Sequence, residues 1–266
     1  MIRIIPIGSG SSGNSMLVEL DGRRILIDLG LSCRRISTRL AEFGITPAQV
    51  DAVLITHTHS DHVNGLKTFL KKYDGPLFMS HTTLRSLLLE DRAQGLDYNR
   101  PREILPGLSV VAVPTSHDCP GSACFRLETE ETRFAFATDL GFVSEEILEQ
   151  LGGCELMVLE ANHDPSMLLN GPYPPLLKQR VRSDRGHLSN MQSAEAAAAF
   201  ALRGTKQFLL AHLSEENNLP ELARQTVQDA LDELTSVKAT ARPLPAFGGE
   251  VLEWPESKQS KNLREE

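Results

Sequence analysis

An apolar run that ends in four potential metal ligands constrains this chain more than any other feature. Residues 52–62 read AVLITHTHSDH, so a segment typical of a buried strand leads directly into histidines and an aspartate. In an extended chain, residues two apart point to the same side, so His57 and His59 can bind one ion together. Where the chain turns into a following helix, Asp61 and His62 can face a second ion. Imidazoles with a carboxylate suit zinc, and manganese or iron are further candidates.

Four other apolar runs each lead to one residue of a metal-binding type. These residues are Asp28, His117, Asp139 and His212. Taken alone, Asp28 or Asp139 could equally be a turn or capping residue. Because α/β folds commonly place their sites at the carboxyl ends of strands, we expect all four to converge with the histidine segment on one site.

Short runs rich in valine, isoleucine and phenylalanine alternate with amphipathic segments along the chain. Strands are expected at residues 2–7, 16–20, 24–28, 52–56, 77–80, 109–114, 123–128, 133–138, 156–160 and 207–212. Helices are expected at residues 33–43, 61–73, 144–151 and 189–203, with a last one beginning near Pro220. This mixture predicts an α/β sandwich in which helices cover two packed sheets. No linker divides it, so residues 1–255 are expected to form one domain, followed by a disordered polar tail at residues 256–266.

Composition narrows the class of protein. No apolar run approaches the roughly 20 residues that span a bilayer, and the N-terminus lacks a basic segment leading into a long apolar stretch, so a cytoplasmic protein is expected. The net charge of −8 argues against a surface coated in basic residues for nonspecific nucleic-acid binding, though not against a local basic patch. The four cysteines form no C-x-x-C pair and are expected to be free thiols.

Together these motifs resemble those of the metallo-β-lactamase-fold hydrolases, and the resemblance runs from Asp28 to His212. It implies an αββα four-layer sandwich that binds two divalent metal ions, zinc or manganese with iron also possible, at the edge between the sheets. The ligands implied for the first ion are His57, His59 and His117. Those implied for the second ion are Asp61, His62 and His212. By the same resemblance Asp139 bridges the two ions, and Asp28 braces the histidine segment.

A second resemblance concerns His187 and Glu160. Residues 186–189, Gly-His-Leu-Ser, resemble the G-H-S-T element of ribonuclease Z-like phosphodiesterases. There the histidine donates a proton to the leaving group and is paired with a carboxylate, a role that Glu160 fits at the end of an apolar run. The expected catalytic residues are therefore His187, Glu160 and the metal ligand Asp61. For His187, a surface histidine that flanks a helix is the alternative.

The chain opens with a glycine-serine segment, GSGSSGNS, at residues 8–15. The segment lacks the Lys-Ser/Thr end of a P-loop, so nucleotide binding of that kind is not supported. Ser11, Ser12 and Asn14 could instead hold a phosphate close to the metals, and a simple hairpin turn is the alternative.

With this opening, two further segments resemble the YycJ/WalJ group of metallo-hydrolases, which implies 5′-to-3′ DNA exonuclease activity. The segments are residues 159–164, LEANHD, and residues 171–182, GPYPPLLKQRVR. In the first segment, Asn162 and His163 could contact substrate phosphate or serve a purely structural role.

The second segment carries a basic stretch of Lys178, Arg180 and Arg182. In an acidic protein this stretch is the best candidate for a track along a nucleic-acid backbone, and a solvated helix face is the alternative. The chain departs from nucleases of the β-CASP type, because the stretch between Asp139 and His187 is too short for their inserted domain. The long arm that clamps tRNA in ribonuclease Z is not evident either.

The sequence therefore predicts a two-metal phosphodiesterase, a 5′-to-3′ DNA exonuclease that uses a metal-bridging hydroxide and has nucleic acid as its partner. A small-molecule phosphodiesterase or thioester hydrolase on the same fold is the alternative, and would need a closed pocket with the basic stretch turned away. A non-catalytic metal-binding regulatory module would tolerate the loss of ligands, and the complete ligand set argues against it.

Overall fold

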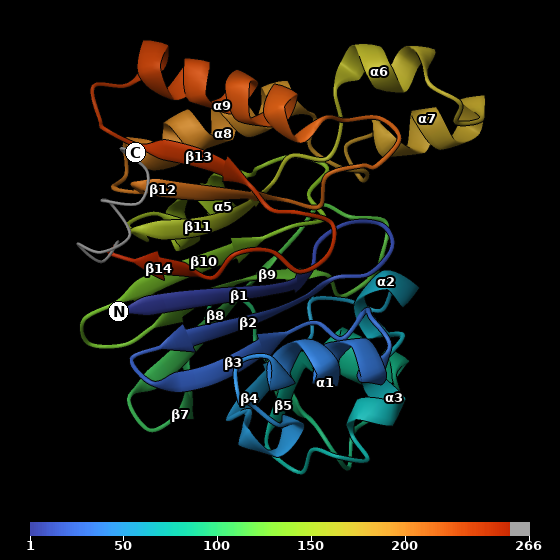
Figure 1. Cartoon of the computed structure of the whole chain (residues 1–266), viewed down its shortest axis with the longest axis vertical. Helices are drawn as coiled ribbons and strands as arrows, with labels where there is room; N and C mark the ends of the chain where they lie inside the picture. The colour runs from blue at the N-terminus through green and yellow to red at the C-terminus, as the bar shows by residue number, and fades with distance from the viewer. Residues whose placement is uncertain (256–266) are drawn as a thin grey trace.

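Two seven-stranded sheets pack face to face in the computed structural model, which describes residues 1–255 (Figure 1). The predicted tail at residues 256–266 lies outside the described residues. The first sheet contains, in spatial order, β14 (Leu252–Trp254), β1 (Ile2–Gly8), β2 (Ser15–Leu20), β3 (Arg23–Ile27), β4 (Ala52–Leu54), β5 (Leu77–Ser80) and β6 (Gln94–Leu96). The second contains β13 (Thr240–Pro243), β12 (Gln207–Ala211), β11 (Leu156–Glu160), β10 (Arg133–Ala137), β9 (Ala123–Glu128), β8 (Leu108–Pro114) and β7 (Arg102–Leu105).

Both sheets are mixed, and each has a parallel part that carries site residues. In the first sheet β3, β4, β5 and β6 are parallel, with Ile25 opposite Ala52. In the second, β10 to β13 are parallel, with Phe134 opposite Leu156. Strands in a parallel sheet are covered on both faces, which is why β11 is buried along its whole length.

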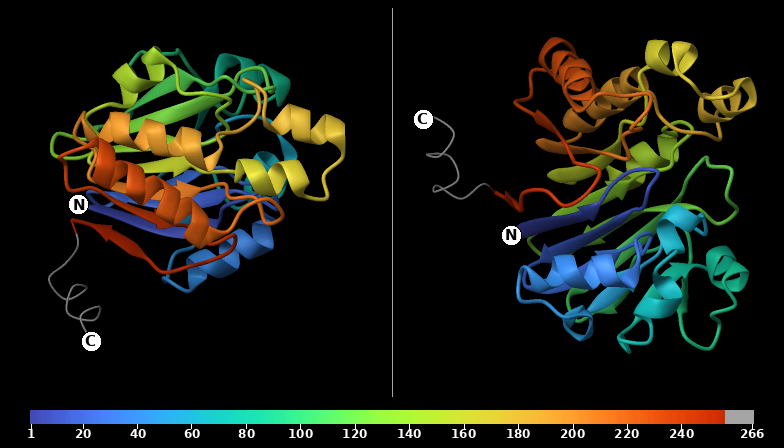
Figure 2. Two further views of the ribbon diagram at one scale, coloured as in Figure 1. Left: turned by 90° about the horizontal axis from the view of Figure 1, so that it is seen from above. Right: turned by 45° about the vertical axis from the view of Figure 1, so that its right-hand side comes forward.

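Three separate apolar cores show that the layers run helix, sheet, sheet, helix. One core, which includes Ile4 and Phe125, lies between the sheets. A second, which includes Phe200, lies between the second sheet and its helices, and a third, which includes Phe69, lies under the helices of the first sheet. The helices over the second sheet are α5 (Glu145–Leu151), α8 (Asn190–Ala201) and α9 (Pro220–Leu234). Those over the first are α1 (Cys33–Ala41), α3 (Leu66–Phe69) and α4 (His81–Ser86) (Figure 2). The predicted four-layer sandwich is confirmed.

The single helix expected at residues 61–73 is instead two short helices, α2 (Ser60–Val63) and α3. The break falls at Gly65, whose N–H donates to the carbonyl of Leu29 at 2.7 Å. A β-carbon at this glycine would lie 2.1 Å from the carbonyl oxygen of Leu31, so only glycine lets the chain cross here. The break keeps the histidine segment against the end of β3.

Several short elements were not among those expected from the sequence. They are β6, β7, β13, β14, α4, the 3₁₀ turn at Pro47–Gln49, α6 (Pro165–Asn170) and α7 (Pro175–Val181). Most are edge strands or helices of two turns or fewer, whose periodic pattern is too short to identify. None of the helices in residues 1–255 is both long and apolar enough to cross a membrane.

The core between the sheets should dominate stability. Phe125 is fully buried there, so Phe125→Ala should lower the free energy of unfolding by about 3–5 kcal/mol through lost contacts and a residual cavity. Urea denaturation followed by circular dichroism measures this change. Leu202→Ala, at a side chain that is largely exposed, is the control and should stay within about 0.5 kcal/mol. A change below about 1 kcal/mol at Phe125 would contradict the packing described above.

Candidate active site

Three ligand-type residues within two residues of the ends of parallel strands have an unusual backbone conformation. Asp28 follows β3, Asp139 follows β10 and His212 follows β12, with φ of 59°, 60° and 57°. Residues other than glycine seldom adopt this left-handed conformation, which costs free energy. At these strand ends it turns the chain sharply, and all three side chains lie buried in one cluster.

Asp28 holds the histidine segment in place through contacts with Thr56 and His62. Its Oδ2 lies 2.7 Å from Nδ1 of His62, and its two oxygens accept from the N–H and the hydroxyl of Thr56, each at 2.8 Å. Burial opposes a charge on His62, but the carboxylates of Asp139 and Asp28 outweigh it and raise the pKa of His62 to about 10. The orientation of this ring is thus fixed by a buried carboxylate, as expected for a metal-binding histidine.

A second brace comes from the glycine-serine segment. The N–H of Asn14 donates to the carbonyl of Asp61 at 2.7 Å, and its side-chain Nδ2 donates to Asp61 Oδ2 at 3.2 Å. The N–H of Gly30 donates in turn to the carbonyl of Asn14 at 2.8 Å. Asn14 is buried behind the ligands, so the structure places it against them and away from the cavity described below.

The implied ligands form two adjacent groups. Within each group, one ligand atom from every residue lies within 4.8 Å of the others. The first group is His57, His59 and His117. The second group is Asp61, His62 and His212. Asp139 stands between them, with Oδ1 3.7 Å from His117 Nε2 and 3.8 Å from His212 Nε2.

Three buried polar atoms in this cluster make no hydrogen bond to any described residue. They are His57 Nε2, His212 Nε2 and Asp139 Oδ2. Burial holds the pKa of His57 well below its usual value, which keeps that ring neutral and able to bind a metal. Burial works against the charge of Asp139, yet the surrounding histidines hold the pKa of its carboxyl well below its usual value. Unpartnered nitrogen and carboxylate donors in a buried cluster fit divalent metal ions.

Glu160 holds two rings of the site at once. Its Oε1 lies 2.8 Å from Nδ1 of His187 and 3.0 Å from Nδ1 of His212. Its Oε2 accepts from the N–H groups of Leu140 and Leu188 at 2.9 and 3.1 Å. Burial would raise the pKa of Glu160, but His187 outweighs it and the carboxyl pKa falls to about 2. The predicted pair of His187 and Glu160 is therefore brought together beside the ligand cluster.

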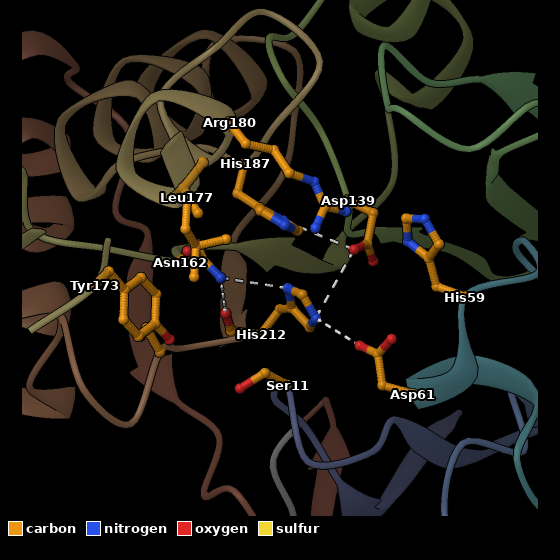
Figure 3. A pocket seen from close by; sticks show the side chains of 12 residues that line it. Ser11, His59, Asp61, Asp139, Asn162, Tyr173, Leu177, Arg180, His187 and His212 are labelled. Carbon is orange, nitrogen blue, oxygen red and sulfur yellow. Dashed lines mark hydrogen bonds and ion pairs between the residues drawn. The ribbon is translucent and has the colours of Figure 1, made fainter. Parts of the chain in front are cut away.

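A cavity of about 260 Å³ opens over the ligands (Figure 3). It is lined by Ser11, His59, Asp61, Asp139, Asn162, Tyr173, Leu177, Arg180, Val181, His187, His212 and Ser214. The sequence singled out neither Tyr173 nor Leu177 nor Ser214. Each had a local signal without an assigned role, since Tyr173 and Leu177 lie in the segment at residues 171–182 that resembles the YycJ/WalJ group, and Ser214 follows His212 by two residues.

The predicted substrate-binding residues occupy different places. Ser11 and Asn162 line the cavity, and Nδ2 of Asn162 donates to the carbonyl of His212 at 2.8 Å. The hydroxyl of Ser12 donates instead to Glu215 at 3.0 Å. His163 is buried and does not line the cavity, and burial lowers its pKa to about 4, so the ring is neutral.

The basic stretch divides between two surfaces. Arg180 lines the cavity, where its Nη2 donates to Asp118 Oδ1 at 3.2 Å. Lys178 and Arg182 line a separate surface hollow, where Nζ of Lys178 donates to the carbonyl of Leu169 at 2.7 Å. The structure thus brings one of the three cations to the cavity.

Gly30 offers a direct test of the second brace. A β-carbon there would lie 1.6 Å from the carbonyl oxygen of Asp61, so Gly30→Ala must displace Asp61. We expect the variant to lose most of its divalent metal, measured by elemental analysis after loading and gel filtration.

Gly22→Ala is the matched control, because nothing lies within 4 Å of a β-carbon at that turn. It should keep its metal content despite the strain of its positive φ of 81°. Equal metal content in the two variants would show that the position of Asp61 does not depend on this contact.

Comparisons with known proteins agree with this geometry. Residues 23–213 match the family described as the beta-lactamase superfamily domain. Exodeoxyribonuclease WalJ of Streptococcus pneumoniae is 35% identical over 232 residues, which cover 85% of this chain and 86% of that protein. Exodeoxyribonuclease YycJ of Bacillus anthracis is 34% identical over 238 residues, which cover 85% of this chain and 88% of that protein.

A solved structure shows the same fold. The metallo-beta-lactamase fold protein YhfI of Bacillus subtilis matches with a TM-score of 0.71, covering 95% of this chain and 100% of its own, at 15% identity. The resemblance predicted from the motifs is confirmed, and so is the expectation of a metal-dependent hydrolase. The chain belongs to the metallo-β-lactamase superfamily.

Proposed function

We propose that this hydrolase is a phosphodiesterase that degrades DNA from its 5′ end. The observation that carries the proposal is the pair of His187 and Glu160, because it sets a proton donor beside a cluster of metal ligands in one cavity. The two relatives named as exodeoxyribonucleases, similar to this chain over most of its length, support DNA as the substrate.

Two divalent ions would be held by the two ligand groups, with Asp139 between them. When bound, such ions neutralise the scissile phosphate and lower the pKa of a water molecule that attacks it. The chain's own contribution is to fix the ligands: Asp28 orients His62, and Glu160 orients His212.

His187 supplies the proton for the leaving group. Its Nδ1 is engaged by Glu160, so Nε2 is the ring nitrogen left for the substrate. The buried carboxylate of Glu160 also fixes the orientation of the ring, which a proton donor requires. Because the side chain is partly exposed on the cavity wall, that proton can reach a bound phosphodiester.

Side chains at the rim of the same cavity can bind substrate phosphate. Arg180 presents a guanidinium whose N–H groups match phosphate oxygens. The Ser11 hydroxyl lies on the opposite part of the rim from Arg180 in Figure 3. A small-molecule phosphodiesterase is the second candidate, because the cavity volume of about 260 Å³ is close to the roughly 300–1,000 Å³ usual for small-molecule sites.

An end-labelling assay tests the proposal. Oligonucleotides labelled at the 5′ or the 3′ end are incubated with the protein and manganese or zinc. We expect a 5′ label to be released as a short product at the first cut. A 3′ label should stay on progressively shorter strands. The opposite order would overturn the direction of degradation. Hydrolysis of bis(p-nitrophenyl) phosphate with intact oligonucleotides would favour the small-molecule candidate.

Removing His187 should separate chemistry from metal binding. His187→Ala should keep its metals and slow oligonucleotide hydrolysis by about 10²–10⁴-fold, because the leaving oxygen then departs without a proton. Hydrolysis of bis(p-nitrophenyl) phosphate, whose leaving group needs no proton, should slow far less. Loss of metal in this variant, checked by elemental analysis, would make His187 a ligand or a structural residue.

A further inference from the structure

Between Glu160 and His187 the chain leaves the sandwich and forms α6 and α7. We call residues 164–182 the α6–α7 arm. In Figures 1 and 2 the arm stands beside the strand ends and covers neither sheet. Because it joins the two residues of the proton-donating pair, its inner side faces the reaction site.

The arm contributes an aromatic and aliphatic wall to the cavity. Tyr173 precedes α7, and Leu177 and Val181 lie four residues apart on one face of that helix. Figure 3 shows Tyr173 and Leu177 on one side of the cavity, with His59 and Asp61 on the opposite side. The ring of Tyr173 is only partly buried, and its hydroxyl makes no hydrogen bond within residues 1–255. The cavity therefore has one polar half and one apolar half.

Arg180 stands at the mouth of the cavity between these halves. Its guanidinium is paired with Asp118; the side chain of Arg180 is 52% exposed and that of Asp118 is 28% exposed. An ion pair that solvent reaches contributes little net free energy, so the guanidinium can exchange Asp118 for a phosphate. A ligand with an anionic group and a flat apolar group matches this arrangement better than a bare phosphate ester does.

We infer that Tyr173 and Leu177 form a stacking wall for the base of the nucleotide whose phosphodiester is cut. The inference rests on the proposed function and specifies its substrate: one nucleotide, whose base has left its neighbours, enters the cavity. The cavity of about 260 Å³ is close in volume to a small-molecule site, so we assign it to a single nucleotide. Aromatic rings stack on any of the four bases, so the wall binds DNA ends without sequence preference.

The test removes the side chain of Tyr173 and the terminal base of the substrate, separately and together, and compares the resulting rates. Single-stranded oligonucleotides carry either a normal or an abasic nucleotide at the end that is degraded, and kcat/KM is measured for the release of that nucleotide. The wild-type protein should prefer the normal end by about fivefold or more, the range of base–aromatic stacking. Tyr173→Ala should lose this preference and leave the abasic substrate within about twofold, whereas Tyr173→Phe, which keeps the ring, should retain the preference.

Leu176→Ala is the matched control, since Leu176 lies on the same helix but points to solvent outside the cavity. It should behave as the wild type on both substrates. Equal losses on the normal and the abasic substrate in Tyr173→Ala, or an unchanged preference, would overturn the stacking wall while leaving the exonuclease in place. A wild-type protein that hydrolyses bis(p-nitrophenyl) phosphate but neither oligonucleotide would overturn the proposed function itself.

Discussion

The buried carboxylate of Asp139 is the constraint on which the rest of the site depends. Its Oδ2 makes no hydrogen bond to the described residues, and four histidine side chains lie within 3.4–3.8 Å of its two oxygens. An isolated buried charge is very costly, so the fold must supply cations or metal ions around it. The parallel parts of the sheets do so, because their strand ends deliver ligands from the two halves of the chain to one edge.

One carboxylate also links the proposed metal site to the proposed proton donor. Glu160 binds the ring of His187 and that of His212, so one carboxylate orients a ligand and the residue proposed to protonate the leaving group. Moving either ring would disturb the other. The α6–α7 arm lies between Glu160 and His187 in the chain, which places the surface proposed for substrate recognition beside the proposed proton-donating pair.

The sequence was sufficient for the central strands and for the residues that cluster at their ends, and insufficient for the edge strands β6, β7, β13 and β14 and for the wall of the cavity. Asp28, Asp139 and His212 were identifiable because each follows a strongly apolar run, a local signal. Tyr173 and Leu177 become cavity residues only through the tertiary position of α7. The basic stretch is divided between two surfaces because of α7, a helix that was not among those expected. Lys178 and Arg182 are four residues apart and line the same surface hollow, whereas Arg180 lines the cavity.

One edge of the sandwich is proposed to hold two metal ions, with Asp139 between them. A crystal of the manganese-loaded protein, measured with anomalous diffraction, tests it most directly. We predict two anomalous peaks about 3.5–4 Å apart, one among His57, His59 and His117 and the other among Asp61, His62 and His212. A single peak under saturating manganese, or peaks outside these two groups, would contradict the account.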